Sequence, residues 1–134
     1  MARTDQLKKV PAFKNLSKAH LDKIAQITEE VEVPAGKVLA KAGERGAEFF
    51  YILEGKAKIE RNGKVADIFT ANEFFGEVTL LDGKPRTATV VAETPMRLLV
   101  VDAKYFPKLL EKTPTLTNEI MRALCMYVRD SHAQ

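Results

Sequence analysis

Hydrophobic and polar positions along this chain follow two different periods, and the period changes twice. Within residues 15–27, Leu21, Ile24 and Ile27 recur at helical spacing, and Ser17 stands where an N-cap is expected. The following part of the chain has short apolar runs separated by glycines, and helical spacing returns in the last quarter of the chain. The pattern therefore predicts a helix, then a β region, then further helices.

The β region consists of short segments that have the composition of strands and are separated by turn residues. These segments are VEV (31–33), KVLA (37–40), EFFYIL (48–53), KAKIER (56–61), TATVVA (87–92) and MRLLVV (96–101). Asn62-Gly63 is a strong signal for a two-residue hairpin, and we expect Ala57 and Ile59 before it to face inward. Short strands at roughly eight- to twelve-residue intervals favour a β jelly roll over a parallel sheet.

The C-terminal part of the chain is expected to form two helical segments. A first turn is predicted at 103–106, and a helix restarts near Pro107, because proline is not tolerated deep inside a helix. Pro114 suits the first position of a last helix, which runs to about residue 130. Its apolar residues recur every four positions, at Leu116, Ile120, Leu124 and Val128. Cys125 on this helix is expected to be a small buried residue.

The length of 134 residues is most simply explained by one domain. Its expected parts are an N-terminal helical segment (about 1–30), a β jelly roll (31–101) and C-terminal helices (102–134). No apolar run is long enough to span a membrane, the N-terminus lacks an apolar signal core, and one cysteine cannot form an internal disulfide. These features predict a cytoplasmic protein. A net charge of +3 with dispersed basic residues gives no reason to expect nucleic acid as a partner.

The same composition argues against an enzyme. Jelly-roll enzymes of the cupin kind need several histidines and a carboxylate around a metal, and this chain has only His20 and His132, far apart in the sequence. No pair of nucleophile and base stands out either. We therefore expect no metal, no cofactor and no catalytic residues.

One stretch, FGEVTLLDGKPRTATV (75–90), combines an acid and an arginine in a run with few other charges. Arg86 offers a planar fork that matches two phosphate oxygens, and free N–H groups after Gly76 would also favour an anion. Glu77 would repel a bare phosphate, but its carboxylate can accept a hydrogen bond from a hydroxyl group. A phosphate joined to a sugar hydroxyl is a nucleotide. A structural ion pair between Glu77 and Arg86 is the alternative that these residues leave open.

The same stretch, with its pattern FGE…LL…PRTATVVA, resembles the phosphate-binding cassette of cyclic nucleotide-binding domains. This is the family of the catabolite activator protein and of protein kinase A regulatory subunits. The resemblance extends over nearly the whole chain and includes GERGAEFFYILEG (43–55). It implies that Glu77 accepts a hydrogen bond from the ribose 2′-hydroxyl and that Arg86 pairs with the cyclic phosphate. It also implies ligand contacts from the rest of the cassette, at Gly76, Val78, Thr79, Thr87 and Ala88.

The resemblance implies a sensor, in which cyclic nucleotide binding moves the C-terminal helix. Leu80 and Leu81 are too apolar to stay exposed, and we expect them to couple the cassette to this helix. Tyr127 is a candidate lid for the base, or it simply packs on the domain. Asn72 stands where the family usually has glycine, and asparagine tolerates the left-handed conformation well. The choice between cAMP and cGMP stays open. The partner of the last helix also stays open, and it is either a second copy of the chain or an effector domain. A degenerate cassette that binds no ligand is the alternative to a sensor.

Overall fold

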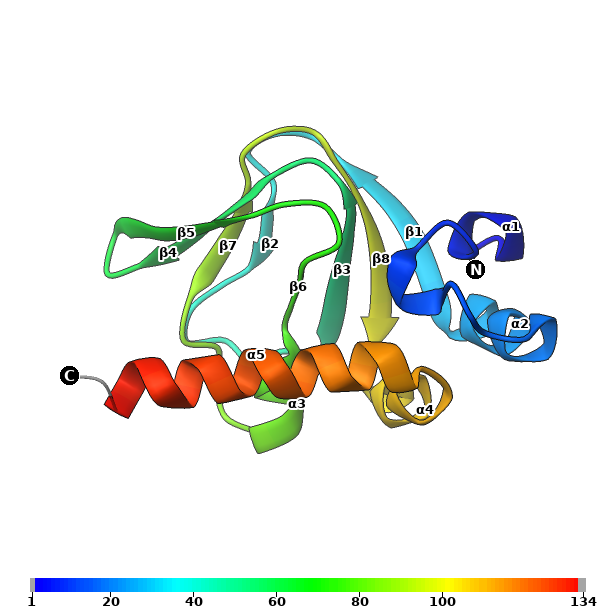
Figure 1. Cartoon of the computed structure of the whole chain (residues 1–134). Coiled ribbons are helices and arrows are strands. Elements are labelled where there is room, and N and C mark those ends of the chain that lie inside the picture. The colour runs from blue at the N-terminus through cyan, green and yellow to red at the C-terminus, as the bar shows by residue number, and fades with distance from the viewer. Residues whose placement is uncertain (1, 133–134) are drawn as a thin grey trace.

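The computed structural model describes residues 2–132, which form two β-sheets flanked by helices at both ends (Figure 1). Each sheet has four antiparallel strands. The first sheet contains, in spatial order, β1 (Thr28–Val33), β8 (Met96–Asp102), β3 (Glu48–Glu54) and β6 (Phe74–Phe75). The second contains β2 (Val38–Ala40), β7 (Thr89–Ala92), β4 (Ala57–Arg61) and β5 (Lys64–Phe69). This arrangement confirms the predicted jelly roll with helices before and after it.

The turn at Asn62-Gly63 joins β4 to β5 as the sequence predicts. Asn62 and Gly63 have φ angles of 55° and 76°, which is the left-handed pair that a tight hairpin requires. Ala57 and Ile59 on β4 are buried between the sheets, while Lys58 and Glu60 on the other face of this strand are partly exposed. Every second side chain of β4 therefore faces the interior of the jelly roll, because successive residues of a strand point to opposite faces.

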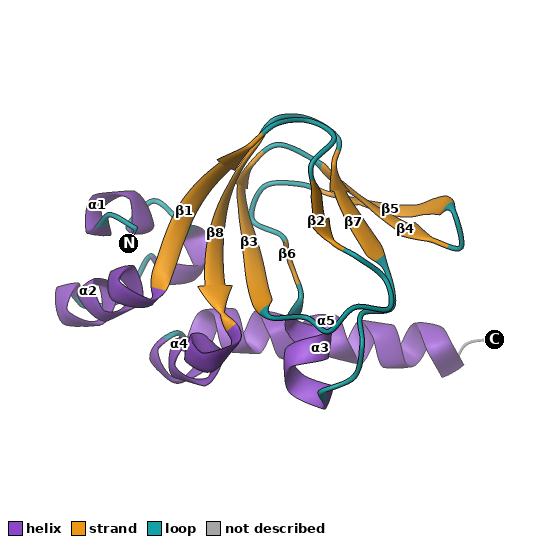
Figure 2. Cartoon of the chain, turned by 180° about the vertical axis from the view of Figure 1, so that it is seen from behind, coloured by secondary structure: helices purple, strands orange, loops and turns teal. Residues whose placement is uncertain are grey.

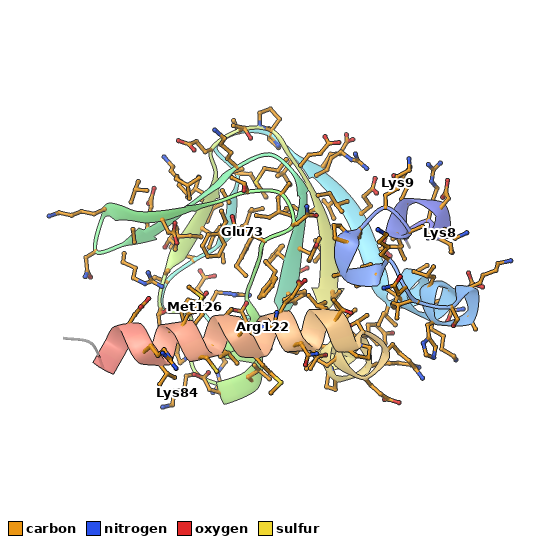
Figure 3. All side chains as sticks on the ribbon, viewed as in Figure 1. Lys8, Lys9, Glu73, Lys84, Arg122 and Met126 are labelled. Atoms are coloured by element: carbon orange, nitrogen blue, oxygen red, sulfur yellow. The ribbon has the colours of Figure 1, made fainter. Side chains whose placement is uncertain are left out.

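Two hydrophobic clusters stabilise the domain. One lies between the sheets and contains Phe50, Phe75 and Leu98, and the rings of Phe50 and Phe75 stack with 4.7 Å between their centroids. The other covers the outer face of the first sheet, where Phe49 packs against Phe106 at 5.1 Å. Figure 3 shows side chains filling the space between the sheets and between the first sheet and the helices. The jelly roll therefore has a packed core, and a cavity at one end of it is described below.

The N-terminal helices cover the outer face of the first sheet. They are α1 (Thr4–Leu7), the 3₁₀ turn η1 (Pro11–Phe13) and α2 (Lys18–Ile27). Ser17 caps α2 as predicted, because its hydroxyl accepts a hydrogen bond from the backbone N–H of His20 at 3.2 Å. After β8, the 3₁₀ turn η2 (Ala103–Tyr105) leads into α4 (Phe106–Lys112), so the predicted restart near Pro107 is also confirmed.

The last helix, α5 (Pro114–His132), crosses the lower ends of both sheets, as Figure 2 shows from behind. Leu116 and Ile120 are buried in the helix-covered cluster, but Val128 near the other end is 55% exposed. Cys125 is exposed, so its expected burial is wrong. It follows Leu124 by one residue, which places it about 100° around the helix from the packed face. Of the described helices, α5 included, none is long and apolar enough to cross a membrane.

We expect Leu98→Ala to lower the free energy of unfolding by about 2–5 kcal/mol, because it leaves a cavity between the sheets. Leu98 is 0% exposed and lies in the central strand β8. Urea unfolding followed by circular dichroism measures the change. The control is Val65→Ala on the edge strand β5, where the side chain is 56% exposed and the effect should stay within about 0.5 kcal/mol. Equal losses in the two variants would contradict this view of the core.

Candidate functional site

A tight turn after β6 positions the acid of the cassette. Gly76 has a φ of 99°, and a β-carbon built there would lie 2.6 Å from the backbone oxygen of Glu48, so only glycine fits. The chain then enters the short helix α3 (Glu77–Asp82), which ends at Gly83 with a φ of 72°. This geometry turns Glu77 back toward the space between the sheets.

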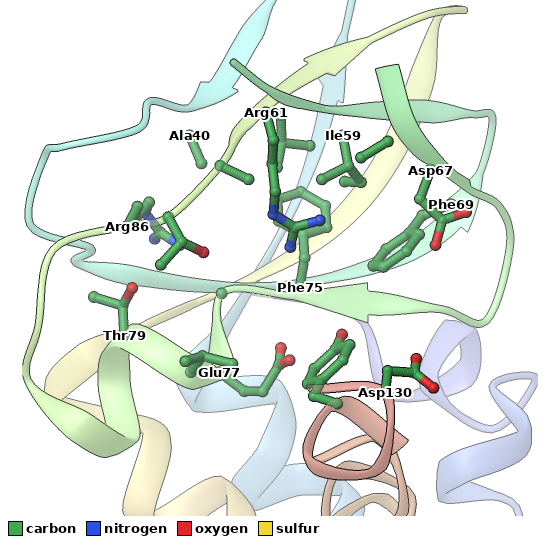
Figure 4. Close-up of a pocket in the computed structure, with 17 residues that line it drawn as sticks. Ala40, Ile59, Arg61, Asp67, Phe69, Phe75, Glu77, Thr79, Arg86 and Asp130 are labelled. Carbon is green, nitrogen blue, oxygen red and sulfur yellow. The ribbon is translucent and has the colours of Figure 1, made fainter. Parts of the chain in front are cut away.

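A cavity of about 590 Å³ lies at this end of the jelly roll (Figure 4). The structure brings together on its wall all of the predicted ligand contacts and the candidate lid: Gly76, Glu77, Val78, Thr79, Arg86, Thr87, Ala88 and Tyr127. These residues come from α3 and the turn before it, from the loop before β7 and from α5. The two halves of the cassette and the last helix therefore face one shared space.

Glu77 is the buried acid of this cavity. Its side chain is 2% exposed, and its Oε2 atom is buried without a hydrogen-bond partner. Burial raises the pKa of the carboxyl from 4.5 to about 7, and a hydrogen bond from its own backbone N–H and the charge of Arg86 only partly offset this. The Oε2 atom of Glu77 is therefore a hydrogen-bond acceptor that is free to bind a donor in the cavity.

Arg86 is half-buried on the same wall, at the opposite side of the cassette. Its Nη2 atom donates to the backbone oxygen of Glu48 at 2.9 Å, which holds one edge of the guanidinium. Burial lowers its pKa, while the charges of Glu48 and Glu77 raise it. Within residues 2–132, Glu77 and Arg86 form no hydrogen bond or ion pair with each other. The simple structural ion pair that the sequence left open is therefore not what the structure shows.

The cavity also has residues that the cassette motif did not reveal. An apolar part is formed by Ala40, Ile59, Phe75 and Val90, and a polar rim by Arg61, Asp67 and Asp130. The alternation on β4 was the available signal for Arg61, since the residue lies two positions after inward-facing Ile59. No local pattern relates Asp130 on α5 to Asp67 on β5, because only the tertiary fold places these elements together.

Three further expectations concern residues around the cassette. Asn72 adopts a φ of 70°, as expected for a substitute of glycine, and its Oδ1 accepts from the hydroxyl of Tyr51 at 3.3 Å. Tyr127 is 42% exposed at the cavity, where burial and the charge of Glu77 raise its pKa. Leu80 packs against the helix-covered cluster, but Leu81 is 50% exposed, so the expected burial of Leu81 is wrong.

Comparisons with known proteins agree with this geometry. Residues 30–113 match the family described as "Cyclic nucleotide-binding domain". A cyclic nucleotide-gated potassium channel of Rhizobium etli is 35% identical over 84% of this chain and 32% of its own length. A cAMP-dependent protein kinase regulatory subunit of Schizosaccharomyces pombe is 34% identical over 87% of this chain and 29% of its own length. A solved structure of cAMP-bound PfPKA-R has a TM-score of 0.76 and 27% identity, over 97% of this chain and 46% of that one.

The two sheets with helices on both sides and the matched region define a jelly-roll domain of a known family. This chain belongs to the cyclic nucleotide-binding domain family. The family resemblance of the cassette is thereby confirmed. The chain spans about a third of the length of the two curated relatives, whose remaining parts lie outside the match.

Proposed function

We propose that this chain is a sensing module that binds cAMP or cGMP in the 590 Å³ cavity and signals by moving α5. The observation that carries the proposal is the buried, unpartnered Oε2 of Glu77, which faces the same cavity as the guanidinium of Arg86. Arg86 would bind the cyclic phosphate, and Glu77 would accept the ribose 2′-hydroxyl. The remaining ligand contacts would come from Gly76, Val78, Thr79, Thr87 and Ala88, with Tyr127 as a lid.

The energetics support a ligand at this place. A buried polar atom without a partner costs about 1–3 kcal/mol, and a ribose hydroxyl would relieve that cost. In a degenerate cassette that binds no ligand, the unpartnered Oε2 atom would destabilise the domain and nothing would offset this loss of free energy. We therefore favour a binding module over a structural or protein-interaction domain.

The proposed module is non-catalytic, and residues 1–134 act as one unit. The printed names of the relatives, a channel and a kinase regulatory subunit, support a regulatory role, in which the effector lies in another part of a longer chain or in a partner. A second copy of the domain or an effector would contact the exposed half of α5. The proposed setting is the cytoplasm.

Isothermal titration calorimetry with cAMP, cGMP and their 2′-deoxy analogues tests the proposal. We expect saturable binding at one site per chain for at least one cyclic nucleotide. The 2′-deoxy form should bind more weakly, because it cannot donate to Glu77. 5′-AMP, which lacks the cyclic phosphate, is the control. Absence of binding by both cyclic nucleotides at millimolar concentration would overturn the proposal.

Gly46→Ala is expected to weaken nucleotide binding about tenfold or more with little change in stability. A β-carbon at this position would lie 2.7 Å from Cζ and Nη2 of Arg86 and 2.8 Å from Cγ2 of Thr79, so the guanidinium must move. Misplacing a positioned group by about 1 Å can cost about 100-fold in a reaction rate, so a loss of about tenfold is expected for binding. Calorimetry measures the loss, and Ala47→Ser at the exposed neighbouring position is the control. Unchanged affinity in Gly46→Ala would mean that Arg86 is not held for the ligand.

Hydrogen exchange over residues 114–130 is expected to change when cyclic nucleotide binds. Tyr127 and Asp130 on α5 line the cavity, so a ligand makes contacts that differ between two positions of the helix. Mass spectrometry of peptides from α5 measures the change, with peptides from the core strand β8 as the internal reference. The Arg86→Ala variant with the same nucleotide is the matched control. Unchanged protection at saturating ligand would mean that the domain does not signal through α5.

A further inference from the structure

A second cavity, of about 580 Å³, lies between the sheets and shares no wall residue with the cavity at the cassette. Residues of β1, β8 and β3 line it from the first sheet, and residues of β2 line it from the second. In Figure 2, β1 and β8 lie on one side of the jelly roll and the β4–β5 hairpin on the other. We call this second space the edge cavity, because β1 and β2 are edge strands of their sheets.

A stacked pair of rings stands between the two cavities. Phe50 lines the edge cavity and Phe75 lines the cavity at the cassette, and their ring centroids are 4.7 Å apart. A ligand in the edge cavity would therefore occupy a site distinct from the one proposed for the nucleotide.

The edge cavity has an apolar wall that the protein itself does not fully cover. The wall consists of Val31, Val33, Val38, Leu39, Leu98 and Val100 together with Phe50. Leu98 is fully buried, but Val38 is 49% exposed and the other four aliphatic side chains are only partly buried. Removing such apolar surface from water stabilises a complex, and small-molecule sites typically have volumes of about 300–1,000 Å³ and mostly apolar walls.

Two carboxylates lie at one end of this apolar wall, directly opposite each other. Glu48 at the start of β3 pairs with Asp102 at the end of β8, and both line the edge cavity. Like charges in this arrangement destabilise a sheet. Within residues 2–132 neither side chain forms an ion pair, and Oδ1 of Asp102 accepts from the backbone N–H of Lys104 at 3.0 Å. A cation at this end would relieve the repulsion.

The other charges of the wall favour the same kind of ligand. Glu29 near the start of β1 adds a third carboxylate, and Lys37 is the one basic residue that the described part of the chain contributes to the wall. Lys37 lies beyond the turn that follows Val33, and four strand residues from Glu29 to Val33 span about 13 Å. The cavity is therefore acidic at one end and apolar along its length.

Two cations of the protein lie close to the acidic end, but neither lines the edge cavity. Burial lowers the pKa of Arg86 and the charge of Glu48 raises it, yet the guanidinium belongs to the wall of the other cavity. The ammonium group of Lys104 lies over the ring of Tyr105, 5.1 Å from its centroid. The positive charge inside the edge cavity would therefore come from a ligand.

We propose that the edge cavity is a second binding site, for a small amphipathic amine. Its apolar part would lie against the valines of β1 and β2, and its ammonium group would lie between Glu48 and Asp102. A ligand with a carboxylate at this end would be repelled, and a neutral ligand would gain from the apolar wall alone. The site is independent of the nucleotide cavity and goes beyond the proposed sensing function.

The test is an NMR titration of the isotope-labelled chain with three probes that differ in the group at the end of the same phenylbutyl chain. They are 4-phenylbutylamine, 4-phenylbutan-1-ol and 5-phenylpentanoate. We expect the amine to bind with a millimolar dissociation constant or tighter. It should bind about tenfold more tightly than the alcohol, because two carboxylates attract its ammonium group, and the carboxylate probe should bind most weakly. The methyl signals of Val31, Val38 and Val100 should shift, and those of Val90 in the other cavity should not.

Charge-removing variants test the acidic end. Glu48→Gln and Asp102→Asn keep the size of each side chain, and asparagine can still accept from the N–H of Lys104. Each variant should weaken binding of the amine about threefold and leave binding of the alcohol unchanged. Equal losses for amine and alcohol would mean that these side chains act on the shape of the cavity and not on the charge of the ligand.

A cavity-filling variant tests the apolar wall. Val31→Phe places a ring in the edge cavity and should abolish binding of both amine and alcohol. The control is Val65→Phe on the edge strand β5, which lines neither cavity and should leave binding unchanged. Thermal unfolding midpoints verify that the variants are folded, and Val38→Phe at the more exposed position replaces Val31→Phe if that variant does not fold.

Three outcomes would overturn the inference: no binding of the amine at millimolar concentration, equal affinities for the three probes, or signal shifts confined to the cavity at the cassette. Sedimentation velocity of the chain alone adds a fourth. A dimer that Val38→Asp dissociates would mean that a second copy of the chain covers the edge cavity. These experiments use no nucleotide, so their failure leaves the proposed function standing, and failure of nucleotide binding leaves this inference standing.

Discussion

Arg86→Ala is expected to weaken cyclic nucleotide binding by roughly 2–5 kcal/mol, because removing one partner of a desolvated charge pair leaves the other charge unpaired. The guanidinium is half-buried on the cavity wall, and its bond to the backbone oxygen of Glu48 holds it in one orientation. A phosphate at this place would therefore meet a donor that is already positioned before binding. Calorimetry with cAMP and cGMP measures the loss.

Tyr127→Ala provides the comparison for this prediction. The tyrosine lines the same cavity but is 42% exposed, and loss of a partial aromatic stack costs only roughly 1–3 kcal/mol. Arg86→Lys keeps the charge and loses the fork, so its affinity should lie between those of the wild type and Arg86→Ala. Urea unfolding of each variant separates binding from folding. Equal losses in Arg86→Ala and Tyr127→Ala would contradict the ranking.

The unliganded domain is expected to lose about 3 kcal/mol of stability between pH 4.5 and pH 7 because of Glu77. Burial raises the pKa of this carboxyl to about 7 in the folded chain, whereas it is 4.5 in the unfolded chain. The folded state therefore binds more protons than the unfolded state in this interval. Stability is fully present below pH 4.5 and is lost as pH rises toward 7, at about 1.4 kcal/mol per pH unit.

Urea unfolding at several pH values between 4 and 8 measures this dependence, with Glu77→Gln as the matched control. Glutamine keeps the size of the side chain and has no proton to release, so its unfolding free energy should lack the decline that the wild type shows. Identical pH profiles for the two proteins would mean that the carboxylate is not desolvated. The experiment uses no nucleotide, so it tests the buried acid independently of binding.

The local structure of this domain follows closely from residue patterns. The Asn62-Gly63 hairpin, the Ser17 cap and the inward faces of Ala57 and Ile59 were all predictable, because they depend on neighbours within a few positions in the chain. The two-residue strand β6 was not predicted, since two residues have no detectable period. The cassette was predictable for the same reason as the hairpin, because its glycine, acid and arginine lie within one short segment.

The composition of the cavity depends instead on contacts between residues far apart in the sequence. Gly46 leaves room for the guanidinium of Arg86, forty positions later, and Asp130 on α5 reaches the rim that Asp67 on β5 also forms. The exposure of Cys125 has the same origin, because hydrophobicity alone does not say which side of α5 meets the domain. Spacing along the chain determines periodic faces and turns. Which faces meet, and which polar groups remain without a partner between them, depends on how the two sheets and α5 pack around one cavity.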